Sequence, residues 1–481
     1  MIAGRQAIVL AVVCLSSAAT SIARGQTAWE YSPYEVRLWV VADADPRLPQ
    51  GIQDDVEEAI KGRADVVFGA VWKLNVETAP PLIAHEVRRG LEGVTIERLM
   101  ELAPEALTSD KLFLVHIKAE AAELSAMAKE LDCRTRQWSA AVEVAAPTLE
   151  VLPIATWDAV AGVFTPLARI ESVEGPQVTA RIRGGGLIVN PASPASIDAD
   201  ECLRPIVRRN DRSGQPAKNG IQSIPWTLLT VSQKDESLLV CQLHSGYRLS
   251  IPTRGGVRTE RLALVVRPRY ESTQLSLQTR GENPRPLTGY EVHARSFGEE
   301  ATQLLGISDW RGEFEVPRTD GGMQTLLVKN GRQLLARLPI VPGQEERMEV
   351  SLVDDDSRLQ AEGAVAALYS RALDLVARRE IVAARFRSRL KERKFDEAQE
   401  LLDQFRTLET RADLSRALDE QQQLISASDK TTQARVDKIF GEARKVLLLK
   451  PLSDDMINTL AAELIRSRST AQQASVESKA K

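Results

Sequence analysis

Histidine, cysteine and aromatic residues are scarce in this chain of 481 residues. It has 4 histidines, 4 cysteines and 5% aromatic residues, and 62 Lys+Arg against 66 Asp+Glu give a net charge of -4. Such a balance predicts no general attraction to nucleic acid or to anionic membranes. The histidines lie far apart without ligand spacing, so no metal site is predicted; they are His85, His116, His244 and His293.

Long apolar runs are also missing, except at the amino terminus. Arg5 precedes an apolar run from 7 to 19, which is too short to span a bilayer as a permanent helix. Small residues then lead to a predicted cleavage site between Gly25 and Gln26. We therefore expect a signal peptide over 1–25 and a mature chain that is soluble in the periplasm or outside the cell. Cys14 follows Val13 inside the apolar run, unlike a lipoprotein cysteine, so no lipid anchor is predicted.

Three cysteines remain after cleavage, too few for a disulfide framework. Cys202 and Cys241 both fall in a strand-rich region, so the sequence leaves open whether they are bridged or free. Arg134 and Arg136 near Cys133 favour a thiolate, but Asp132 opposes it and no histidine is adjacent. We interpret Cys133 as an ordinary thiol.

The length predicts several domains of mixed α+β class. The pattern of strands and helices divides the mature chain into an α/β domain over 26–165, a small β-barrel over 166–280, a β-sandwich over 284–353, a helical bundle or coiled coil over 357–467 and a disordered tail over 468–481.

The first domain alternates strands and helices. Strands are expected at Glu35–Val41, Val71–Val76, Lys111–Ile117 and Thr135–Val144, and helices at Gln53–Ala64 and Leu152–Phe164, the latter amphipathic. The segments Asp110–Val115, Glu130–Asp132 and Arg136–Trp138 resemble small periplasmic α/β domains. Such domains occur in the flagellar T-ring protein and in the lipoprotein activators of peptidoglycan synthases. The resemblance implies partner binding without chemistry.

Short strands in the second region predict a small antiparallel barrel or sandwich. They are expected at Ile224–Val231, Leu238–Leu243, Tyr247–Ile251 and Arg261–Val266. Its opening segment, Ala168–Gly175, resembles the SH3-like module of the same flagellar protein. Gly184, Gly185 and Gly186 follow a strand, but no helix with phosphate-binding spacing comes next. We therefore predict a turn or bulge here and not a phosphate loop.

The third region contains a turn of the form D-x-x-G. Asp309 can accept hydrogen bonds from the turn backbone, and Gly312 can take a positive φ. With the strands at Leu287–Val292 and Met348–Val353, this order resembles transthyretin-like, carboxypeptidase-regulatory-like sandwiches. The resemblance implies a structural or adhesive module.

The last region shows an apolar stripe at helical spacing from Val365 to Leu390. Ser357 with Gln360, and Thr410 with Asp413, are predicted helix caps. The acidic run 354–356 is interpreted as a helix start, with calcium binding as the alternative. A basic cluster has two interpretations, a solvated face or a site for phosphate or wall polymer; it comprises Arg385, Arg387, Arg389, Lys391, Arg393 and Lys394.

No G-x-S-x-G elbow occurs and no carboxylate pair stands out, so no catalytic, cofactor or metal residue is predicted. Across the mature chain, Trp29–Tyr34, Ile224–Thr227 and Leu335–Pro339 resemble secreted bacterial proteins that combine these modules. That resemblance implies no particular activity. We expect a non-enzymatic envelope scaffold with protein partners, and self-association through its helices is an open alternative. A wall-associated hydrolase with scattered site residues is the competing hypothesis.

Overall fold

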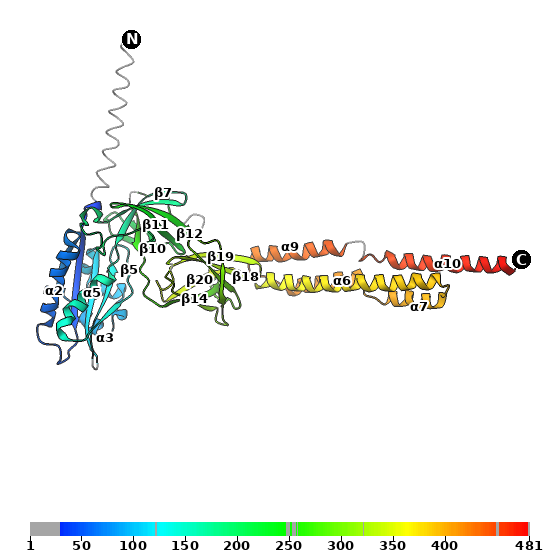
Figure 1. Cartoon of the computed structure of the whole chain (residues 1–481), viewed down its shortest axis with the longest axis horizontal. Coiled ribbons are helices and arrows are strands. Elements are labelled where there is room, and N and C mark those ends of the chain that lie inside the picture. The colour runs from blue at the N-terminus through cyan, green and yellow to red at the C-terminus, as the bar shows by residue number, and fades with distance from the viewer. Residues whose placement is uncertain are drawn as a thin grey trace, which may run out of the picture.

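The computed structural model describes residues 29–120, 123–246, 251–252, 256, 258–320, 322–448 and 452–479. The predicted signal peptide and Cys14 lie outside these residues. The chain forms a globular head, from which a long helical rod extends to the carboxyl end (Figure 1). Within the described ranges, no helix is both long and apolar enough to cross a membrane.

The head begins with a mixed sheet in the order β2-β1-β3-β4-β5, with β6 paired to β4. Its strands are β1 (Tyr34–Ala42), β2 (Trp72–Thr78), β3 (Lys111–Glu120), β4 (Glu123–Asp132), β5 (Gln137–Trp138) and β6 (Val142–Ala146). β1 runs parallel to β2 and β3, and β4 returns antiparallel to β3. Apolar side chains alternate along β3, so Phe113 and Val115 join one core, and Leu112 and Leu114 the other.

Helices cover both faces of this sheet. α2 (Ile52–Val67) and α5 (Leu152–Val163) pack on one face, and α3 (Pro81–Arg89) and α4 (Ile96–Leu102) on the other. The predicted amphipathic character of α5 is wrong. Its exposed face is not polar, because Ile154 is exposed beside Asp158. Leu152, Trp157 and Val160 pack against α2 and the sheet.

The prediction of one strand over Thr135–Val144 is also wrong. A turn with Arg136 at φ 55° precedes β5, which ends at Trp138, and β6 begins only at Val142. β4 was not predicted. Its sequence, ELSAMAKELD, mixes charged and small residues without a clear period of two.

Six strands of the next unit close into a barrel, in the order β9-β11-β12-β8-β7-β13 and back to β9. They are β7 (Leu167–Glu174), β8 (Gln177–Ile182), β9 (Cys202–Asn210), β11 (Thr227–Asp235), β12 (Leu238–Ser245) and β13 (Thr259–Val265). β10 (Pro216–Ser223) pairs antiparallel with the second half of β9, whereas β11 pairs with the start of β9. The expected small barrel is therefore present, although β9 and β10 were not predicted. The predicted strand Tyr247–Ile251 lies largely outside the described residues.

Two further sheets enclose one core, which includes Leu275, Tyr290 and Leu326. One has the order β17-β14-β20 and the other β16-β15-β18-β19. Their strands are β14 (Ser272–Thr279), β15 (Glu291–Ser296), β16 (Gln303–Ile307), β17 (Glu313–Pro317), β18 (Gln324–Asn330), β19 (Gln333–Ile340) and β20 (Arg347–Leu352). β14 falls inside the range 166–280 that the sequence assigned to the barrel, yet it hydrogen-bonds to β17 and β20.

The predicted D-x-x-G turn is confirmed. The Oδ1 atom of Asp309 accepts hydrogen bonds from the backbone of Arg311 at 2.8 Å and of Glu313 at 2.7 Å. Gly312 has φ 72°.

The rod is built around the 36-residue helix α6 (Asp356–Lys391). Its other helices are α7 (Phe395–Arg406), α8 (Arg411–Leu424), α9 (Lys430–Leu447) and α10 (Asp455–Lys479). The first half of α6 packs with α8 and α9, and the second half with α7 and α10. The predicted helical carboxy-terminal region is thus present (Figure 1).

Two details of the rod differ from expectation. The range 468–481 was predicted to be disordered, but α10 continues to Lys479, since 467–479 holds no glycine or proline to end it. Ser357 does not cap α6, because its hydroxyl donates instead to the carbonyl oxygen of Ser426 at 2.9 Å. The Thr410–Asp413 capping box at the start of α8 is confirmed.

Candidate functional site at the domain junction

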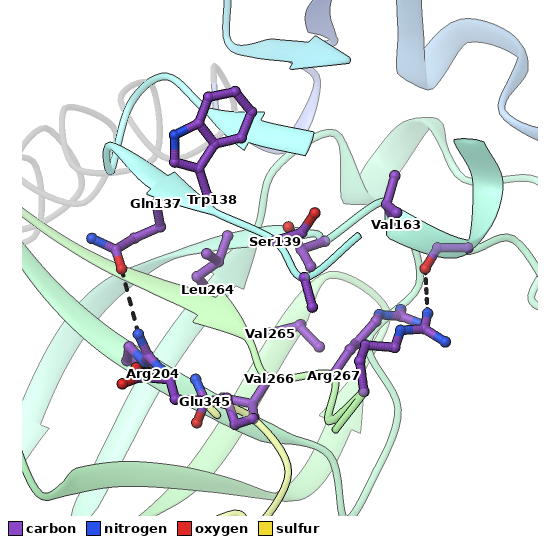
Figure 2. Close-up of a pocket in the computed structure, with 15 residues that line it drawn as sticks. Gln137, Trp138, Ser139, Val163, Arg204, Leu264, Val265, Val266, Arg267 and Glu345 are labelled. Atoms are coloured by element: carbon purple, nitrogen blue, oxygen red, sulfur yellow. Dashed lines mark hydrogen bonds and ion pairs between the residues drawn. The ribbon is translucent and has the colours of Figure 1, made fainter. Parts of the chain in front are cut away.

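A cavity of about 230 Å³ lies where the three parts of the head meet (Figure 2). The α/β domain contributes Gln137, Trp138 and the end of α5, and the barrel contributes Arg204 and Val265. The segment from the barrel to β14 and the β19–β20 turn complete the wall. A single water needs about 10–15 Å³ on the same measure, so the space suits a small molecule.

Three arginines line this cavity, and each is held differently. Arg204 forms an ion pair with Glu345, and its Nη1 donates to the amide oxygen of Gln137 at 3.4 Å (Figure 2). Arg267 donates from Nη2 to the carbonyl oxygen of Pro194 at 3.3 Å, and Glu201 lies 3.9 Å away.

Arg269 is bound only to backbone. Its guanidinium donates to the carbonyl oxygen of Gly162, and no carboxylate pairs with it among the residues that the structure describes. Burial lowers the pKa of Arg269, and repulsion from Arg267 and Arg318 lowers it further. These guanidinium groups therefore offer positive charge and donors to an oxygen-rich group.

The rod offers a second kind of surface. Large aliphatic side chains stand exposed along it, in contrast to the cores between its helices; they include Leu373, Ile381, Leu424, Leu448 and Ile465.

The cysteines that the sequence singled out are buried and unbridged. Cys202 and Cys241 do not form the disulfide that was one of two alternatives. Burial raises the pKa of Cys133 to about 12, and the charge of Asp132 adds to that rise. The ordinary-thiol interpretation of Cys133 therefore fits its environment better than a reactive thiolate.

The histidines stay apart in the fold. His116 is buried on β3, and its Nε2 lies 2.8 Å from Oδ1 of Asp43. The ring of His244 packs edge-on against Phe297 at 5.1 Å, and burial lowers the pKa of His244. Within the described ranges, no three His, Cys, Asp or Glu residues gather in a way that could hold a metal ion.

Several residues of the charged runs on the helical region form ion pairs. In the basic cluster, Arg387 contacts Glu463 at 3.3 Å and Arg389 contacts Glu397 at 3.0 Å. In the acidic run, Asp355 contacts Arg358 at 2.6 Å. These pairs favour the solvated-face interpretation of the basic cluster and the helix-start interpretation of the acidic run.

The glycine run forms a turn, as predicted. Gly184 has φ 65° and leads into a short 3-10 turn, Gly185–Leu187. A Cβ at Gly186 would meet the ring of Tyr31 at 2.5 Å, so the close approach of that ring requires glycine.

Sequence reasoning missed the arginines of the junction cavity. Arg267 and Arg269 follow the last barrel strand. Arg204 lies more than sixty residues before them in the sequence, and Glu345 lies more than seventy residues after them. The one local signal was two arginines spaced by a proline directly after a strand.

Comparison with known proteins does not assign this chain to a family. No protein-family model matches the chain, and no curated protein matches its sequence. Among solved structures, TolB from Acinetobacter baumannii matches at 12% identity over 67% of this chain and 96% of its own, with a TM-score of 0.17. A TM-score at this level does not establish a common fold.

Proposed function

We propose that this chain is exported and acts as a non-enzymatic scaffold or binding protein of the bacterial envelope, through contacts with other proteins. One observation carries the proposal: the long rod is fixed to the head by buried polar contacts. A rod so fixed presents its sides to partners in a defined direction.

The joint centres on Arg358 in the first turn of α6. Its Nη2 donates to the carbonyl oxygen of Asn330 at 2.7 Å and lies 2.6 Å from the carboxylate of Asp355. The backbone N–H of Asp355 donates to the hydroxyl of Tyr290 at 3.1 Å. Asp355 and Arg358 are 1% and 4% exposed, so water cannot replace these bonds at little cost.

A second polar anchor supports the middle of the rod. Arg379 is 1% exposed and donates to the carbonyl oxygens of Leu452 at 3.1 Å and Glu409 at 3.0 Å. It thereby ties the α7–α8 and the α9–α10 connections to α6, and the two three-helix halves stay in line.

In this proposal the head modules are partner-binding domains. The α/β domain binds partners, as the periplasmic α/β domains that it resembles do. The barrel acts as an SH3-like module, and the two-sheet unit acts as a transthyretin-like sandwich. All three assignments rest on the sequence resemblances.

Photo-cross-linking tests the scaffold function. A benzophenone residue at Leu373, exposed on α6, is expected to trap a protein from envelope fractions or a second copy of the chain. The same residue at Gly298, in a turn of the head, compares the head with the rod and shows which of the two makes the contact. Absence of both a partner and an oligomer, with turnover of isolated wall fragments, would instead support a hydrolase.

Export is tested separately. Cell fractionation with amino-terminal sequencing is expected to find the mature chain outside the cytoplasm, beginning at Gln26. A cytoplasmic chain that retains residues 1–25 would contradict the proposal.

A further inference from the structure

The junction cavity holds more positive charge than its own carboxylates balance. Glu345 pairs with Arg204, and Glu201, which pairs weakly with Arg267, is not part of the cavity wall. Arg269 has no carboxylate partner in the described part of the chain.

One donor in this wall is also unused. The Nε atom of Arg267 is buried and has no acceptor within the described residues. A buried N–H without an acceptor costs about 1–3 kcal/mol, so such groups usually serve a ligand or a water. Since Arg267 and Arg269 are two residues apart and line the same space, a single group placed between them would receive donors from both.

We propose that the junction cavity binds a small ligand through a carboxylate or phosphate group, held by Arg267 and Arg269. Planar guanidinium groups match two-oxygen acceptors in geometry as well as charge. The site goes beyond the scaffold function, because it takes a small anion where the rod takes a protein.

Binding at this position would also couple the parts of the head. The wall combines Gln137 of the α/β domain, Arg204 of the barrel and Glu345 of the turn between β19 and β20. An anion would remove the repulsion between arginines from neighbouring segments and so stabilise the closed junction. Ligand binding should therefore raise the melting temperature of the head.

The experiment uses the mature chain with sodium phosphate in one arm and sodium malonate in the other. Each is compared with sodium chloride at equal ionic strength, by calorimetry and by thermal melting. We expect one saturable site in at least one arm, and the arm with the tighter site identifies the acceptor. R269Q and R267Q should each weaken binding about tenfold, the loss of one charge-assisted contact.

A third variant works in the opposite direction. E345Q frees Arg204 from its carboxylate and should tighten binding about tenfold. A folding defect cannot produce that gain. R406Q, which changes an exposed arginine paired with Asp403 on α7, is the matched control and should bind as the parent does. No saturable binding in either arm, or equal binding by the parent, R269Q and E345Q, would overturn the proposal.

Discussion

Gly312 shows how a single residue can fix a turn. With φ 72°, its backbone is in the left-handed region, and a Cβ there would lie 2.4 Å from the carbonyl oxygen of Leu277. Only glycine fits both conditions.

Gly312→Ala should therefore destabilise the two-sheet unit by roughly 2–4 kcal/mol, from backbone strain and a steric clash. Amide hydrogen exchange in β14 and β17 measures the change. Gly298 has φ 82° but open space around its Cβ position, so Gly298→Ala should cost only about 1 kcal/mol. Equal exchange in both variants would mean that the clash is relieved without cost.

The buried thiols predict a sensitivity to alkali. Burial raises the pKa of Cys133 to about 12 from an ordinary 9.0. Above pH 9 the unfolded chain therefore loses this proton while the folded chain keeps it, and stability falls by up to about 1.4 kcal/mol per pH unit until about pH 12. Below pH 9 the contribution is constant.

Urea unfolding at pH 8 and pH 10.5 tests this prediction. Cys133→Ala removes the ionisable group, so its stability should fall less between the two pH values than that of the parent. The parent should also resist thiol reagents at pH 8 until it is unfolded. An identical pH dependence in both proteins would refute the assignment.

At the scale of the element, two sequence-predicted caps behave differently. The side chain of Thr410 accepts from the N–H of Asp413, and the Asp413 carboxylate accepts from the N–H of Thr410 at 3.0 Å. The hydroxyl of Ser357 instead reaches Ser426.

Thr410→Ala should cost about 1 kcal/mol and increase hydrogen exchange in the first turn of α8. Ser357→Ala is the matched control, and exchange at the start of α6 should change little, since its hydroxyl caps no helical N–H. A larger effect at Ser357 than at Thr410 would contradict the described geometry.

Most of the elements that could be predicted from the sequence were predicted from the local periodicity of apolar residues. β1, β3 and α2 have strong apolar patterns, and their ranges follow closely from the sequence. The rod was predicted to be helical from its apolar stripe, but α10 extends well beyond its predicted end. β4, β9 and β10 were missed because charged residues interrupt their alternation: β9 reads CLRPIVRRN. β9 is held in place by its hydrogen bonds to β11 on one edge and β13 on the other, and the local sequence pattern does not reveal these long-range contacts.

The junction cavity was beyond sequence reasoning for a different reason. Arg204, Arg267 and Glu345 come from separate elements, and only the packing of the head brings them together. The spacing of these residues along the chain therefore does not predict that they lie close together.

At the scale of the whole molecule, the joint between head and rod depends on Arg358. Arg358→Met would leave the buried carboxylate of Asp355 with Arg435, at 3.8 Å, as its one ion-pair partner among the described residues. Loss of one partner of a buried pair costs roughly 3–5 kcal/mol.

We expect Arg358→Met to loosen the rod without unfolding its helices. Small-angle scattering should show a broader distribution of maximum dimensions, and limited proteolysis should cut near 353–356. Arg406→Met removes an exposed ion pair on α7 and should change neither measurement. A rod that stays aligned in Arg358→Met would show that apolar contacts alone hold the joint.

The length of α6 sets a distance between the two ends of the molecule. At 1.5 Å per residue, its 36 residues extend about 54 Å, several times the screening length of about 8 Å at physiological salt. The electrostatic potential of an anion bound in the head is therefore screened before it reaches the far end of the rod, where α7 and α10 pack on α6. Any communication between a small anion at one end and a protein at the other would have to be mechanical, transmitted along this one helix.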